Sequence, residues 1–231
     1  MKSERKLNLT ERAEDVREKH PVVLFALDDI KQHFEENLQV IRSQFETAEY
    51  LLENDLKRAC EDVWHAQIVF IASALDFYMH ELTKYGLCQI FERNWEGTEK
   101  YNNINVKMVY VDRVINNEED ENWFLEYVNS AYAHVTMISV DSMKEQLNLL
   151  GIDWKGIADK VFYQEGALEK PEDQFKQILN TLFRRRNAIA HQLDREHADA
   201  LFKPIDRKTV ETFIDNVQKL VEAIHEKAEE K

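Results

Sequence analysis

Apolar residues recur along this chain with the 3.6-residue period of amphipathic α-helices. In one segment they follow the i, i+3, i+4, i+7, i+8 rule for a single helical face: Phe175, Ile178, Leu179, Leu182 and Phe183. Similar stripes predict long helices over residues 22–52, 56–94 and 207–228, and shorter ones over 140–149 and 154–163. Segment 56–94 is apolar over most of its circumference, which is typical of the central helix of a bundle.

Residues that begin and end helices agree with this pattern. No Gly or Pro occurs within residues 22–85, so we expect two long helices there, divided near residues 54–55. Gly151 is suited to end a helix, Pro171 to begin one, and Asp206 to cap the last one. With 5 Gly and 3 Pro in 231 residues, the chain lacks the turn chemistry of a β-sheet protein. We predict an all-α fold with no sheet of more than two short strands.

The predicted helices can share one core, because the chain is long enough and, at 44% hydrophobic residues, apolar enough. We predict a charged N-terminal extension over residues 1–20 and a single helical domain over residues 21–231. Residues 95–140 are less regular, and we interpret them as an insertion of unassigned purpose. A brief extended segment is expected within it, around residues 106–111.

Arg186 occupies a position on an apolar face where a core residue is expected. It lies one helical turn after Leu182 and Phe183, and the apolar stripe resumes beyond it. A guanidinium there requires an acidic partner, a subunit interface or an anionic ligand. Asn187 and His191 are four residues apart and share a neighbouring face, about 100° round the helix. The three polar side chains can therefore reach a shared cleft.

Asp76 is the candidate acidic partner of Arg186, since a carboxylate accepts both arms of a guanidinium. It belongs to a polar stripe on the predicted helix 56–94 that also contains Ser73, His80 and Lys84. The alternative is that this stripe simply faces solvent.

The combination of arginine and histidine suits phosphodiester chemistry. An imidazole moves protons near neutral pH, and an arginine neutralises charge that develops on phosphate oxygens. Arg184 and Arg185 extend the densest basic cluster of the C-terminal half and are candidate substrate-binding residues. The alternative interpretation is an ordinary helix surface, with exposed arginines and an exposed His191.

The run from Arg186 through Asn187 to His191 resembles the signature of the HEPN superfamily. Its members carry an arginine, then a polar residue, and a histidine four to six positions after the arginine. Residues 149–154 before the motif and 204–206 after it are similar to the RiboL-PSP type of HEPN domain. The segment 72–77 resembles an early core helix of the same group. The similarity extends over roughly residues 60 to 228.

This resemblance implies a HEPN-like helical bundle with long N-terminal helices, and a metal-independent endoribonuclease active as a homodimer. Motif helices of two subunits would face each other across a two-fold axis. His191 would act as general acid or base for attack of a ribose 2′-hydroxyl, and Arg186 would stabilise the phosphate oxygens. Asn187 would orient His191 or the phosphate. DNA would not be cleaved, because it lacks the 2′-hydroxyl. The alternative is a non-catalytic helical module for dimerisation or protein docking.

Charge and motif content narrow the remaining functions. A net charge of −14 argues against sequence-blind coating of nucleic acid and favours a restricted RNA site. We find no Gly-rich phosphate loop and no metal-ligand motif, so we expect no cofactor and no metal. Neither a membrane-spanning segment nor a signal peptide is expected, and the two cysteines have no paired spacing, which favours a cytoplasmic location. The family's settings imply toxin–antitoxin systems or phage defence, with an antitoxin or other regulatory protein as partner.

Overall fold

A computed structural model describes residues 22–116, 122–196 and 198–231 of the chain. Within these ranges it contains nine α-helices and no strand, and the only β-type pairing is an isolated bridge between Arg195 and Phe202. The predicted all-α fold is therefore confirmed. The predicted extension over residues 1–20 lies outside the described residues. None of the described helices combines the length and the hydrophobicity that crossing a bilayer requires.

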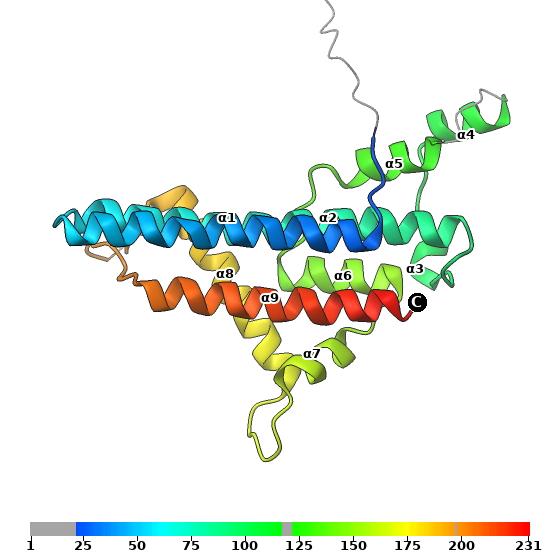
Figure 1. Cartoon of the computed structure of the whole chain (residues 1–231). Helices are drawn as coiled ribbons and strands as arrows, with labels where there is room; N and C mark the ends of the chain where they lie inside the picture. The colour runs from blue at the N-terminus through cyan, green and yellow to red at the C-terminus, as the bar shows by residue number, and fades with distance from the viewer. Residues whose placement is uncertain (1–21, 117–121, 197) are drawn as a thin grey trace, which may run out of the picture.

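Two long antiparallel helices form the backbone of the bundle. Helix α1 (Leu27–Glu53) and helix α2 (Lys57–Phe91) are joined by a tight turn in which Asp55 has a φ of +59°. The predicted division near residues 54–55 is correct, although α1 begins later than the apolar pattern indicated. Helix α9 (Arg207–Glu229) packs against both of them (Figure 1).

Helix α2 is the central helix, as its nearly continuous apolar surface predicted. It contacts α1 and α9 as well as α5, α6 and α8. Its side chains Ile68, Ile71 and Leu75 are completely buried, and Tyr78 meets Phe34 of α1 in an edge-to-face contact with ring centroids 5.8 Å apart. One continuous cluster of buried residues extends from α1 to α9.

The region between α2 and α6 is more helical than predicted. It contains α3 (Glu99–Asn102), α4 (Met108–Ile115) and α5 (Trp123–Tyr132). The extended segment expected around residues 106–111 was wrong, because residues from Met108 onward form α4. Helix α4 packs against α5: Tyr110 packs edge-on against Tyr127, and Arg113 forms an ion pair with Glu126 at 3.3 Å. Such partners are invisible in a short stretch of sequence.

The last four helices begin and end close to the predicted positions. Helix α6 (Val140–Leu150) ends at Gly151, whose φ of +69° lies in the left-handed region that glycine favours. It is followed by α7 (Trp154–Phe162) and α8 (Pro171–Gln192). Trp154 stacks on Phe175 at 4.0 Å and fixes the first half of α8 to α7. At the start of α9, Asp206 accepts a hydrogen bond of 2.8 Å from the Thr209 amide, as a capping residue should.

Candidate functional site

The motif residues lie on the last turns of α8, which is helical without a break through His191. The helix ends after Gln192, where Leu193 takes a left-handed conformation with φ +50°. The apolar stripe is buried only in its first half: Phe175, Leu179 and Leu182 are buried, whereas Leu193 is 68% exposed. The motif therefore lies where α8 emerges from the core.

Arg186 is half-buried and lines a surface pocket of about 400 Å³. The opposite wall is the polar stripe of α2, with Ser73, Asp76 and His80, and Asn129 of α5 also contributes. The Nη1 atom of Arg186 donates a hydrogen bond of 3.0 Å to Oδ1 of Asn187, and its Nε atom is buried without a hydrogen-bond partner in residues 22–116, 122–196 and 198–231. Among the described residues, no carboxylate forms an ion pair with this guanidinium. Its positive charge is therefore not neutralised by an ion pair within the part of the chain that the structure describes.

Asp76 shares this pocket with Arg186 but does not pair with it. Its Oδ1 atom accepts a hydrogen bond of 2.7 Å from the Met137 amide, and its Oδ2 atom lies 3.9 Å from Nε2 of His80. Asp76 thus holds the backbone that precedes α6 against α2. The structure brings the two predicted partners to one pocket without the ion pair that the sequence had left open.

Asn187 and His191 follow the helical geometry on which their selection was based. Asn187 is half-buried and contacts Arg186, whereas His191 is exposed in the last turn of α8. His191 does not line the pocket that contains Arg186. Within one chain, Arg186 and Asn187 are therefore in contact, while the His191 side chain is exposed on the surface.

Arg185 is held inside the chain by a buried carboxylate. Its Nη2 atom lies 2.5 Å from Oδ2 of Asp194 and donates a hydrogen bond of 3.0 Å to the Pro204 carbonyl. The same Asp194 oxygen lies 3.0 Å from Nε2 of His65 on α2, and Asp194 is completely buried. We call Arg185, Asp194 and His65 the Asp194 cluster. Arg184, by contrast, is exposed and available to a ligand.

The Asp194 cluster was missed in the sequence. Burial lowers the pKa of His65, although the neighbouring Asp194 carboxylate opposes this change. A neutral imidazole can donate its Nε2 proton to Asp194, while Arg185 supplies the positive charge that the buried carboxylate needs. An acidic residue just after a helix was the only signal, and nothing local connected it to a histidine on another helix.

Comparison with known families agrees with the resemblance noted in the motif. The model of the family described as RiboL-PSP-HEPN matches residues 26–230. The chain therefore belongs to the RiboL-PSP-HEPN family, a group of helical HEPN domains. Searches among curated proteins and among solved structures found no match.

Proposed function

We propose that this protein is a metal-independent endoribonuclease with Arg186, Asn187 and His191 as its catalytic residues. The observation that carries this proposal is the unneutralised guanidinium of Arg186, half-buried in a polar pocket on the same helix end as an exposed His191. A half-buried arginine without a carboxylate partner is suited to bind an anionic ligand. Family membership supports the same conclusion, because HEPN domains often act on RNA.

The proposed reaction is an internal transfer of the phosphate. His191 takes the proton from a ribose 2′-hydroxyl, the 2′-oxygen forms a bond to the adjacent phosphorus, and the bond from phosphorus to the 5′-oxygen breaks. A protonated imidazole returns a proton to the leaving 5′-oxygen. Arg186 binds the non-bridging oxygens as negative charge builds up on them, and Asn187 keeps the guanidinium in place through their hydrogen bond. The products end in a 2′,3′-cyclic phosphate and a 5′-hydroxyl.

A second copy of the chain would complete the site. Arg186 and His191 are five residues apart, so they point in directions about 140° apart around α8. Apolar side chains on the surface near the pocket support a subunit contact: Phe77 is 40% exposed at the pocket, and Phe70, one heptad earlier on α2, is 46% exposed. We expect a homodimer in mass measurements at micromolar concentration. A strict monomer that is fully active would contradict the composite site.

The remaining parts of the proposal concern organisation and setting. Residues 21–231 form a single domain, with residues 95–140 as its insertion. RNA is the substrate, the location is cytoplasmic, and an antitoxin or other regulatory protein controls the activity in a toxin–antitoxin or defence system. The alternative, a non-catalytic docking module, expects Arg186 to pair with an internal acid such as Asp76 and His191 to face open solvent. His191 is exposed, but no ion pair joins Arg186 and Asp76 among the described residues.

The test is cleavage of end-labelled structured and unstructured RNA by purified protein. We expect 2′,3′-cyclic phosphate ends, unchanged product formation in the presence of a chelator, and no cleavage where the scissile ribose is 2′-deoxy. His191→Ala should reduce the rate about 10²- to 10⁴-fold. The matched control is Gln192→Ala, an exposed neighbour on the same helix end, which should retain full activity. Full activity of His191→Ala, or ends other than a cyclic phosphate, would contradict the mechanism.

A further inference from the structure

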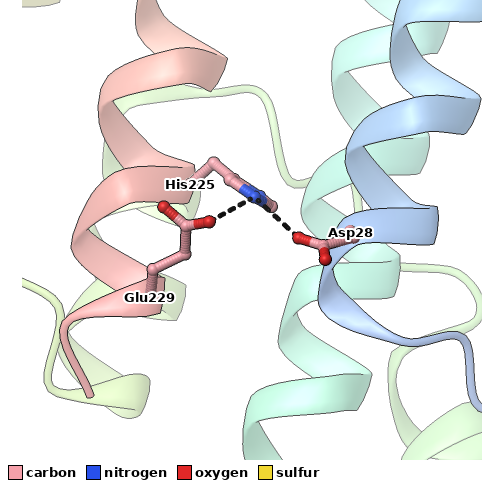
Figure 2. A group of neighbouring side chains, drawn as sticks. All are labelled: Asp28, His225 and Glu229. Atoms are coloured by element: carbon pink, nitrogen blue, oxygen red, sulfur yellow. Dashed lines mark ion pairs between the residues drawn. The ribbon is translucent and has the colours of Figure 1, made fainter.

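Three side chains from helices α1 and α9 converge far from the Arg186–His191 motif. Asp28 lies in the first turn of α1, and His225 and Glu229 lie one turn apart near the end of α9. Figure 2 shows the His225 ring between the two carboxylates, with its Nε2 atom 3.7 Å from Oδ1 of Asp28 and 3.5 Å from Oε1 of Glu229. The imidazole is 1% exposed, whereas both carboxylates reach the surface.

An ordinary ion pair accounts poorly for this arrangement. Both distances from Nε2 exceed the 2.7–3.2 Å of a normal hydrogen bond. The other ring nitrogen, Nδ1, is buried and has no hydrogen-bond partner among the residues that the structure describes. Two carboxylates therefore approach a buried imidazole nitrogen, and neither is at the distance of a normal hydrogen bond.

These separations are close to those of atoms that share a metal ion. Zinc binds histidine nitrogen and carboxylate oxygen at about 2.0–2.2 Å, so two ligands of a tetrahedral ion lie about 3.4 Å apart. The three ligand atoms of this group all lie within 4.8 Å of one another. His225 and Glu229 also have the i, i+4 spacing that places two ligands on one helical face. The distances from His225 are nearly those required, and the two exposed carboxylate oxygens would have to approach each other by up to about 1.4 Å to complete the set.

We propose that Asp28, His225 and Glu229 bind a divalent transition-metal ion of the Zn²⁺ type, with water in the remaining position. The ion fastens the start of α1 to the end of α9, and its role is structural. It does not take part in RNA cleavage, because His225 lies about 27 Å along α9 from Arg207, where that helix begins three residues after Pro204, whose carbonyl accepts a hydrogen bond from Arg185 of α8. The two proposals are therefore independent.

The experiment uses the full, untagged chain after removal of metal. Calorimetric titration with Zn²⁺ should give one site per chain, and Co²⁺ should give an absorption spectrum of a low-symmetry site with nitrogen and oxygen ligands. Asp28→Asn and Glu229→Gln alter exposed ligands and should each weaken binding at least about 10-fold. Asp29→Asn makes the same change of charge at the next exposed residue and should bind as the wild type does.

A second measurement follows the effect on stability. Zn²⁺ should raise the Tm of the wild type and of Asp29→Asn, and should raise the Tm of the two ligand variants by less at the same concentration. His225→Gln is a weaker test, because a buried residue can affect folding directly. Absence of stoichiometric binding, or equal binding by the ligand variants and the Asp29→Asn control, would overturn the proposal. Neither result would bear on RNA cleavage.

Discussion

Arg185 and Arg186 are adjacent in the sequence and of the same type, yet their surroundings are opposite. Arg185 forms an ion pair with the completely buried carboxylate of Asp194 and donates a hydrogen bond to a backbone carbonyl, so it is occupied within the Asp194 cluster. Arg186, about 100° round the helix, lines an open polar pocket and pairs with no carboxylate among the described residues. The role of each arginine is therefore set by what lies opposite it in the fold.

The Asp194 cluster stabilises the end of α8 that carries Arg186. Asp194 follows α8 directly, and its contact with His65 ties the end of that helix to α2. Since Arg185 also reaches the Pro204 carbonyl, the connection to α9 is held as well. The end of α8 that carries Arg186 and His191 is thereby fixed on a rigid framework, as a catalytic site requires.

The largest expected effect is the loss of RNA cleavage when Arg186 is replaced. Arg186→Ala should lower kcat/KM for RNA about 10²- to 10⁴-fold, because it removes the charge that binds the phosphate oxygens. The free energy of unfolding should change little, since the guanidinium has no ion-pair partner to leave behind. Steady-state kinetics and urea unfolding of the same preparation measure both quantities. A variant that unfolds easily but cleaves RNA normally would reverse the proposed roles of the two arginines.

The next largest effect is a loss of stability when Arg185 is replaced. Arg185→Ala should reduce the free energy of unfolding by about 3 kcal/mol, because it leaves the Asp194 carboxylate buried without its main countercharge. Asp194→Asn in the same background should restore part of this loss, since the unpaired charge is then gone. Urea unfolding of the single and double variants measures the coupling. Additive effects of the two substitutions would show that Asp194 and Arg185 do not stabilise each other.

A smaller effect should appear on acidification. The pKa of His65 in the folded protein lies below its unfolded value of about 6.5, so the unfolded chain takes up the proton first as pH falls. The contribution of His65 to the free energy of unfolding is therefore fully present above about pH 6.5. It is lost as the pH falls from there toward the lower pKa of the folded protein. Besides Asp194 and Arg185, the charges that face His65 are Arg58 and Asp62.

Urea unfolding at pH 7.5 and pH 5.5 tests this dependence. The difference in stability between the two pH values should be smaller in His65→Gln than in the wild type. It should not vanish, because the pKa of buried His225 is lowered in the same sense. An unchanged difference would mean that His65 takes up its proton equally well in the folded and unfolded chains.

The smallest effect is expected at Arg184, the first arginine of the run. Arg184 is exposed, so Arg184→Ala should change the free energy of unfolding by less than about 0.5 kcal/mol. Its loss of RNA cleavage should be milder than that of Arg186→Ala, and the activity that remains should depend less strongly on salt than that of the wild type if Arg184 binds phosphate. Cleavage rates at several salt concentrations measure this. A loss as large as that of Arg186→Ala would move the phosphate site outward along α8.

The sequence by itself determined the features that depend on neighbouring residues. Helix periodicity and capping by Gly151, Pro171 and Asp206 arise within one or two turns, and all of these were predicted correctly. The motif on α8 was found in the same way, because its spacing has meaning on any unbroken helix. Short helices such as α4 were missed, since their apolar pattern is too brief to distinguish a helix from an extended segment.

The tertiary structure alone decided which polar groups meet. Asp194 reaches His65 across 129 positions of sequence, and Asp28 meets His225 only because α1 and α9 lie side by side (Figure 1). It also decided that Asp76 binds the Met137 amide and that Arg186 has no ion pair among the described residues. The physical reason is that burial and long-range pairing set the environment of a charge, and both depend on how the helices pack.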